Sequence, residues 1–436
     1  MILCVNPWID DFTAYDLWAK PLGLIEIASW LKQNGFDVAV ADLLYQHYPE
    51  LSQKASVKMT GRGNYLRREI PRPELLKHVS IPRKFYQYGM SKEDASALLS
   101  RYPRPRLILL TSMMTYWYSG LRATVDFLKK TYPEVPVIGG GIYTRLCRNH
   151  ALRVFDDIEI APQETYSFLR ERVRESTGHA PLIPSGPFSI SPDYTYYPSL
   201  PYIPLRFTRG CPYRCRYCAG PLLEPRYIES RLEKIKLEFE YGYKKGIKDF
   251  VFYDDALLFS KERLLHPFLK WIEQQGMKAR FHTPNGLHVA LFDEKTLALM
   301  RAAGEWEFRF GVETLIKNQR QPLDVKTDWH DLQQLAALLL KEEFNLEHVR
   351  IYLLAGLPGQ PRMEVEESIK MVKGLGLRPI PNEYSPIPGT PLFNNAVKSS
   401  VYDLQEPLFQ NKSIVPCSWE EQTWRDVQEL KELARS

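Results

Sequence analysis

The sequence predicts an α/β fold made of two consecutive blocks, a parallel sheet with helices on both faces and then a partial parallel barrel. Two observations support this prediction. Along most of the 436 residues, short apolar runs alternate with stretches that carry apolar residues at helical spacing. A segment rich in Pro, Ser and Tyr, residues 177–204, separates the two alternating blocks and is typical of an ordered linker.

The first block, residues 1–176, contains the pattern of a doubly wound sheet. "MILCVNP" opens the chain as a short apolar run ending in Asn-Pro, and the helical stretch after it stops at Gly35. Strand and helix alternate after that, which favours parallel pairing. The predicted strands are 1–7, 36–44, 106–114, 135–141 and 157–162, and the predicted helices are 21–35, 121–133 and 142–155.

A basic insertion, residues 46–104, interrupts this first block. Between Ser52 and Met90 it holds nine Lys or Arg against two Glu, together with several prolines and tyrosines. One interpretation is a solvated insertion, as is common for long loops. The other is a lid or docking surface for an anionic cofactor or partner.

The second block, residues 205–395, repeats a strand and a helix about six times, as a full or partial parallel barrel requires. A helical tail, residues 396–436, follows and ends in an amphipathic stretch. In such barrels the chemistry lies at the C-terminal ends of the strands. The predicted strands are 204–210, 248–258, 278–287, 305–314, 348–359 and 378–392, and the predicted helices are 231–246, 263–276, 293–304, 329–344 and 365–376.

The composition is that of a globular enzyme, with 44% apolar and 25% charged residues. A net charge of +5 argues for neither a nucleic-acid nor a membrane partner. The N-terminus lacks the basic and apolar regions of a signal peptide, and no apolar run approaches the length of a membrane span. We therefore expect a cytoplasmic protein, whose six cysteines are too sparse for a disulfide scaffold.

Three cysteines, Cys211, Cys215 and Cys218, are spaced C-x3-C-x2-C directly after the first predicted barrel strand. A structural zinc site uses four protein ligands, and no fourth cysteine or histidine lies near this loop. An iron-sulfur cube held by three thiolates keeps one iron open for a small ligand. The spacing favours the cluster, while a zinc site and three unreactive buried cysteines stay open as alternatives.

With Tyr217 just before the last cysteine, "TRGCPYRCRYC" resembles the radical S-adenosylmethionine (SAM) superfamily. "FGVET", "IYLLAGLPGQ" and "SPIPGTPLF" are similar to motifs on later strands of the branch with an N-terminal cobalamin-binding-type domain. The resemblance covers roughly residues 1–395. It implies a Rossmann-like, cobalamin-binding-type parallel sheet followed by a partial (β/α)6 TIM-like radical SAM barrel.

The resemblance implies a 4Fe-4S cluster held by the three cysteines, with SAM bound at its open iron. From the residues alone, Tyr217 could also be a core aromatic, either aspartate of "FYDDALL" a helix cap, and Glu313 a buried hydrogen-bonding residue. The implied SAM contacts are Tyr217, Asp254, Asp255, Glu313, Gly356, Pro358 and Gly359.

The resemblance also implies cobalamin, with one departure from the family pattern. No histidine has the D-x-H-x-x-G context of a cobalt ligand, and "SMMTYWYSG" stands at the expected place. Either cobalamin is bound without a protein nitrogen ligand, or the domain keeps the fold as a scaffold. The implied cobalamin contacts are Pro21, Leu22, Ser112, Met113, Met114, Thr115, Gly139, Gly140 and Gly141.

The function implied is reductive cleavage of SAM and abstraction of a substrate hydrogen, followed by cobalamin-dependent methyl transfer to an unactivated carbon. Without cobalamin, cyclisation, oxidation or epimerisation would follow. The expected partners are a small-molecule or peptide substrate and an electron donor such as flavodoxin or ferredoxin. A tRNA-methylthiolating enzyme is a rival, but such enzymes carry three further N-terminal cysteines, where this chain has Cys4 and Cys147. A nonenzymatic cofactor-binding module is the remaining alternative.

Overall fold

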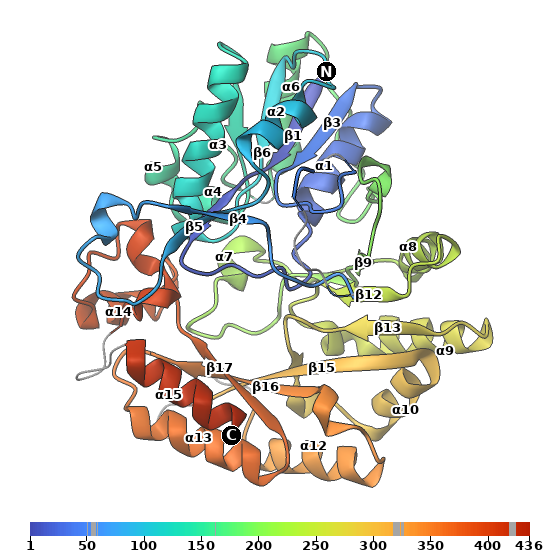
Figure 1. The fold of residues 1–436 in the computed structure, drawn as a ribbon. Helices are drawn as coiled ribbons and strands as arrows, with labels where there is room; N and C mark the ends of the chain where they lie inside the picture. Colours follow the sequence, from blue (N-terminus) through green and yellow to red (C-terminus); the bar gives the residue numbers. More distant parts are fainter. Residues whose placement is uncertain are drawn as a thin grey trace. The chain divides into compact units, whose positions relative to one another are not determined.

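The chain divides into two units, Met1–Pro201 and Tyr202–Ser436, in a computed structural model (Figure 1). The division falls inside the predicted linker 177–204. The structure describes all residues except 50, 54–57, 59, 162, 317–322, 324–326 and 418–423. No helix within the described ranges is long and apolar enough to cross a membrane.

The first unit is built on a parallel five-stranded sheet in the order β3-β1-β6-β7-β8. The interior strand "ILCVN", which pairs with a strand on each side, is buried at every position, as expected for a parallel strand covered on both faces. The predicted Rossmann-like sheet is therefore confirmed. The strands are β1 Ile2–Asn6, β3 Val38–Asp42, β6 Leu107–Leu110, β7 Val137–Gly139 and β8 Asp157–Ile158.

Helices cover this sheet on two sides, with α1 and α3 on opposite sides in Figure 1. Leu24 and Leu31 of α1 and Leu169 of α6 pack with Leu107 and Leu109 of the sheet in one apolar cluster. The predicted helix 142–155 is two short helices. The helices are α1 Leu22–Gln33, α3 Tyr118–Thr131, α4 Ile142–Leu146, α5 Arg148–Ala151 and α6 Thr165–Thr177.

The basic insertion has secondary structure of its own. Its strands β4 (Arg67–Ile70) and β5 (Phe85–Tyr88) form an antiparallel sheet with β2 (Ile9–Asp11), in the order β2-β5-β4, and α2 (Lys92–Leu99) follows. The Gln87 side chain donates a hydrogen bond of 3.0 Å to Asp10. The insertion is therefore attached to the segment that follows β1.

The second unit is built on six parallel strands in the order β17-β16-β15-β13-β12-β9, which confirms the predicted partial barrel. A short strand, β14 (Leu287–His288), pairs with β15 beside this path. The strands are β9 Tyr202–Leu205, β12 Asp249–Phe252, β13 Ala279–His282, β15 Gly304–Glu313, β16 Val349–Ala355 and β17 Arg378–Glu383.

Aromatic side chains fill the space between these strands and their helices. Phe281 of β13 stacks on Trp306 of β15 with ring centroids 4.6 Å apart, and Phe239 of α8 lies 4.3 Å from Phe250 of β12. Burying each aromatic ring removes a large apolar area from water, which stabilises the barrel wall. The helices are α8 Leu232–Lys244, α9 His266–Gln274, α10 Glu294–Ala303, α12 Trp329–Lys341 and α13 Arg362–Gly374.

The tail packs on the last part of the barrel. It contains α14 (Phe393–Ser399), a buried irregular segment, and α15 (Trp424–Arg435). Arg362 of α13 forms an ion pair of 2.7 Å with Asp426 of α15. The final helix is therefore fixed against α13.

Candidate functional site

The three-cysteine loop lies between β10 (Thr208–Arg209) and α7 (Gly220–Leu223), at the C-terminal end of β9. None of these three cysteines forms a disulfide; Cys215 is buried, and Cys211 and Cys218 are partly buried. The backbone N–H of Gly220 donates to the Cys218 sulfur at 3.3 Å. Hydrogen bonds of this kind stabilise thiolate charge and tune iron-sulfur sites.

Gly210, directly before Cys211, determines the backbone conformation at the start of this loop. Its φ is +71°, and a Cβ at this position would lie 2.4 Å from the carbonyl oxygen of Arg226. A glycine is therefore required, since any side chain would meet both a disfavoured backbone conformation and another backbone. Our sequence reasoning missed this role, although the glycine next to the first cysteine was a visible signal.

Two of the predicted SAM contacts, Tyr217 and Glu313, are hydrogen-bonded to each other. Burial raises the pKa of Tyr217 well above its ordinary value, and the Glu313 carboxylate and the thiols of Cys215 and Cys218 raise it further. Glu313 ends β15 with a φ of +63°, where the register with β16 shifts. The tyrosine is therefore a neutral donor to the carboxylate.

The two predicted aspartates differ in their surroundings. Asp254 is buried, and its carboxylate accepts hydrogen bonds from the backbone N–H groups of Phe207 (3.0 Å) and Thr208 (2.6 Å) and from the Thr208 hydroxyl (2.8 Å). Burial raises the pKa of Asp254 to about 7. Asp254 thus joins the end of β12 to the strand that leads into the cysteine loop, whereas Asp255 is exposed.

The turn after β16 contains Gly356, Pro358 and Gly359, and both glycines have left-handed φ angles of +88° and +72°. A Cβ on Gly356 would lie 3.7 Å from Val415 of the tail. Val415 itself has a φ of +50°, a strained conformation for a β-branched residue. The tail therefore reaches the barrel mouth, which the sequence did not reveal because the contact joins segments far apart in the chain.

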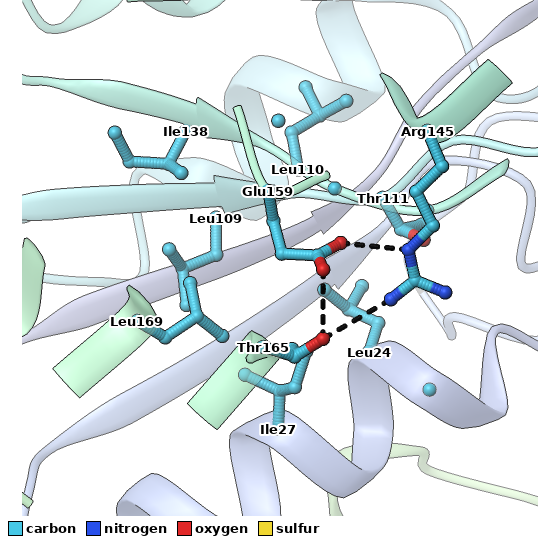
Figure 2. A pocket seen from close by; sticks show the side chains of 14 residues that line it. Leu24, Ile27, Leu109, Leu110, Thr111, Ile138, Arg145, Glu159, Thr165 and Leu169 are labelled. Carbon is cyan, nitrogen blue, oxygen red and sulfur yellow. Dashed lines mark hydrogen bonds and ion pairs between the residues drawn. The ribbon is translucent and has the colours of Figure 1, made fainter. Parts of the chain in front are cut away.

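The first unit contains a pocket at the C-terminal ends of β6 and β7, beside α1 (Figure 2). It encloses about 600 Å³ of space, counting solvent at its mouth. Most of the wall is apolar side chains and glycine backbone. The lining residues are Gly23, Leu24, Ile27, Leu109, Leu110, Thr111, Ile138, Gly139, Gly140, Gly141, Arg145, Glu159, Thr165 and Leu169.

A closed polar network lies in this pocket. Arg145 donates through Nε to Glu159 at 3.0 Å and through Nη2 to Thr165 at 3.2 Å, and Thr165 donates to Glu159 at 2.9 Å (Figure 2). The Glu159 side chain is 4% exposed, so its charge depends on this pairing. Sequence reasoning missed Arg145 and Glu159, since nothing in their local pattern places them together.

The predicted cobalamin contacts are distributed over two neighbouring places. Gly139, Gly140 and Gly141 line the pocket of Figure 2, whereas Ser112 and Met113 line a smaller cavity beside Trp117. The Ser112 hydroxyl donates to the Gly140 carbonyl at 2.7 Å, which ties the two loops together. Neither lining includes Pro21, Leu22, Met114 or Thr115.

Among the residues that the structure describes, no group of three His, Cys, Asp or Glu side chains is placed to hold a single metal ion.

Residues 205–372 match the model of the radical SAM superfamily. An uncharacterized methyltransferase, PH0819, of Pyrococcus horikoshii is 26% identical over 210 residues, which cover 46% of this chain and 43% of that protein. The ribosomal protein uS12 methylthiotransferase RimO of Bacteroides fragilis is 23% identical over 185 residues, covering 39% and 41%. The chain thus spans less than half the length of these relatives.

Solved structures are similar across both units. The radical SAM methyltransferase TsrM from Kitasatospora setae, with cobalamin and a [4Fe-4S] cluster bound, is 14% identical with a TM-score of 0.64, covering 92% of this chain and 76% of that one. The cobalamin-dependent SAM radical enzyme OxsB, with aqua-cobalamin and SAM bound, is 11% identical with a TM-score of 0.56, covering 97% and 57%. These likenesses show a shared fold.

Proposed function

We propose that this member of the radical SAM superfamily is a cobalamin-dependent methyltransferase that acts on an unactivated carbon. The observation that carries the proposal is the pocket of the first unit, which lies where α/β sheets bind ligands, beyond the carboxyl ends of the strands. A domain kept solely as a scaffold has no need of such a pocket. The shared fold with TsrM and OxsB supports the same conclusion.

The donor set of the second unit fits a 4Fe-4S cluster. Cys211, Cys215 and Cys218 supply three thiolates, and the N–H of Gly220 already points to one sulfur. A fourth iron would stay open to SAM. Bound together, the cluster, SAM and cobalamin supply the radical that removes a substrate hydrogen and the methyl group that replaces it.

Around these cofactors the chain's own residues have positioning roles. Glu313 would accept hydrogen bonds from the ribose hydroxyls of SAM, and Tyr217 would pack near its adenine. The left-handed turn at Gly356 and Gly359 would let the backbone approach the ligand closely. Asp254 would act indirectly, because its carboxylate holds the backbone that leads into the cysteine loop.

In the first unit the apolar pocket wall would bury part of the cofactor and exclude water. Leu24 and Ile27 of α1 would face the ligand from one side, and Leu109 and Ile138 of the sheet are further wall residues. The ion pair of Arg145 with Glu159 would provide the polar contacts. A cytoplasmic setting, which we also propose, would keep the cysteine thiols reduced.

The test is to purify the protein without oxygen in the presence of cobalamin and to quantify bound corrinoid by absorption and mass spectrometry. We expect about one corrinoid per chain, as a one-pocket site implies. Ile27→Trp, which fills the pocket, should abolish binding, while Gln33→Trp on the exposed face of α1 should retain it.

A wild-type protein that binds no corrinoid but still cleaves SAM would overturn the cobalamin part of the proposal. That result would favour the scaffold alternative, with cyclisation, oxidation or epimerisation as the reaction. Corrinoid bound equally by Ile27→Trp would show that the cofactor lies outside this pocket.

A further inference from the structure

We propose that a cavity at the N-terminal ends of three barrel strands binds a small anion that carries phosphate groups. The cavity lies where β12, β13 and β15 begin, and it encloses about 770 Å³, counting solvent at its mouth. That volume is in the range of small-molecule sites. In parallel barrels the chemistry occupies the opposite, C-terminal ends of the strands, where the cysteine loop follows β9. The cavity is therefore separate from the cysteine loop, and this proposal does not depend on the proposed function.

Positive side chains dominate the wall of this cavity. Its lining contains four cationic side chains and one carboxylate, that of Glu305. The cations come from the connection before β12, from the start of β13 and from the last turn of α10, and they are Lys248, Lys278, Arg280 and Arg301. A hollow lined mostly by one sign of charge concentrates the electrostatic field and raises the local concentration of the opposite ion. The cavity therefore attracts anions.

The guanidinium of Arg280 is already held in one position. Its Nε donates to the Asp249 carboxylate at 3.0 Å, and its Nη2 is a second donor to the same group. The Asp249 side chain is 2% exposed and lies 2.8 Å from Nε2 of His282, which fixes it in turn. Within the described part of the chain these bonds use Nε and Nη2, so the Nη1 edge can donate to a ligand. A donor fixed beforehand loses little conformational entropy when a ligand binds.

The two lysines of the lining form no ion pair with a carboxylate of the described residues. Lys248 is exposed, and its ammonium lies 4.5 Å from the ring centroid of Tyr243. Lys278 donates to the carbonyl of Ala302 at the end of α10. Arg301, by contrast, lies beside the carboxylate of Glu342, with 3.6 Å between Nη1 and Oε2. The lysine charges are thus available to an anion, and lysine is a common phosphate-binding residue.

A phosphate group fits these donors better than a single carboxylate does. At neutral pH a phosphate monoester carries a charge of about −1.5 to −2 and has three strong acceptor oxygens, so one group can accept from several cations at once. The carboxylates of Glu305 and Glu342 interrupt the cations, which disfavours the long, continuous backbone of a nucleic acid. The observations therefore favour a small phosphate-bearing molecule, either a free oligophosphate or a nucleotide.

The first experiment locates pyrophosphate and ADP on the full chain by lysine acetylation and mass spectrometry of the peptides. At ten times its dissociation constant, either anion should slow acetylation of Lys248 by at least about fivefold, because few cavities are then empty. Lys370, exposed on α13 and outside the lining, is the internal control and should react at an unchanged rate. Titration calorimetry at physiological ionic strength gives the two dissociation constants.

Two substitutions at exposed residues should change the affinity for pyrophosphate in opposite directions. Lys248→Met keeps the apolar stem but removes the charge, so binding should weaken about fivefold. Glu305→Gln removes the carboxylate of the lining, so binding should tighten. Lys370→Met loses the same charge as Lys248→Met outside the cavity and should bind pyrophosphate as wild type does. Thermal unfolding without ligand should give the wild-type Tm for all three variants.

The outcomes separate the two sources of phosphate from a wrong proposal. Tighter binding of ADP than of pyrophosphate supports the site with a nucleotide as its ligand, and the reverse order supports it with a free oligophosphate. The proposal is overturned if the wild-type chain binds neither anion. It is also overturned if Lys248→Met binds pyrophosphate as wild type does, since the anion would then lie elsewhere, for example on the basic insertion. Tighter binding of an oligoglutamate peptide or of single-stranded RNA than of both small anions would overturn it as well.

Discussion

The hydroxyl of Tyr217 donates a hydrogen bond to the carboxylate of Glu313, which joins the cysteine loop to the end of β15. Glu313 adopts a left-handed backbone conformation there, at a cost of about 1–2 kcal/mol for a residue with a Cβ. The hydrogen bond helps to offset that cost. It also holds the carboxylate in place before any ligand arrives.

We predict different effects on SAM affinity from substituting the two members of this pair. Glu313→Gln removes a charge-assisted acceptor and should weaken SAM binding by about tenfold, or about 1.4 kcal/mol, within the range of hydrogen bonds to charged groups. Tyr217→Phe frees the carboxylate and should leave SAM affinity equal or tighter. Anaerobic calorimetry of the cluster-loaded protein measures both.

The exposed Glu347→Gln variant, on the turn before β16, is the control and should bind SAM as wild type does. Iron content should be unchanged in all three proteins. If Tyr217→Phe weakens SAM binding as much as Glu313→Gln does, the tyrosine hydroxyl is itself a ligand contact. That result would disprove the expectation that the hydroxyl competes with SAM for the Glu313 carboxylate.

The sequence was sufficient to predict the structural features that depend on local residue patterns. Alternating residues such as Trp306, Phe308 and Phe310 predicted β15, and the cysteine spacing predicted the loop. Features that depend on distant partners were not predictable. The family resemblance implied Asp254 as a SAM contact, and the sequence did not show that its carboxylate accepts hydrogen bonds from the backbone N–H groups of Phe207 and Thr208.

The structure of the basic insertion also could not be predicted from local sequence pattern. Its prolines and charges indicated a loop, whereas β4 and β5 pair with β2, which is formed by a segment more than fifty residues earlier in the chain. The pairing depends on contacts such as that of Gln87 with Asp10, which no local pattern encodes.

Gly210→Ala should damage the cysteine loop. The new Cβ would meet the Arg226 carbonyl at 2.4 Å as well as a φ of +71°. Gly246 is a matched control because its φ is +81° and a Cβ there meets nothing within 4 Å. We expect Gly246→Ala to cost about 1–2 kcal/mol of unfolding free energy and Gly210→Ala to cost more, with loss of bound iron. Equal costs with full iron content would show that the loop relaxes freely.

Removing one member of the ion pair in the pocket of the first unit should lower the unfolding free energy more than replacing both members by apolar residues. Glu159→Ala leaves the Arg145 guanidinium without its carboxylate partner and should lower the unfolding free energy by about 3 kcal/mol. The double variant Arg145→Met/Glu159→Leu replaces both charges by apolar groups and should recover most of that loss. Urea unfolding of the three proteins tests this. A double variant as unstable as the single one would show that the charges themselves stabilise the fold.

The pH dependence of the unfolding free energy should reveal the raised pKa of Asp254. Burial raises its pKa from 3.8 to about 7, so between these pH values the folded protein retains a proton that the unfolded chain has lost. The unfolding free energy therefore falls as pH rises through this window, by at most about 1.4 kcal/mol per pH unit from this group. Asp254→Asn cannot ionise, and its stability relative to wild type should rise over the same window. Urea unfolding of both proteins near the two ends of the window gives the comparison; a constant difference would mean that Asp254 is already ionised at its lower end.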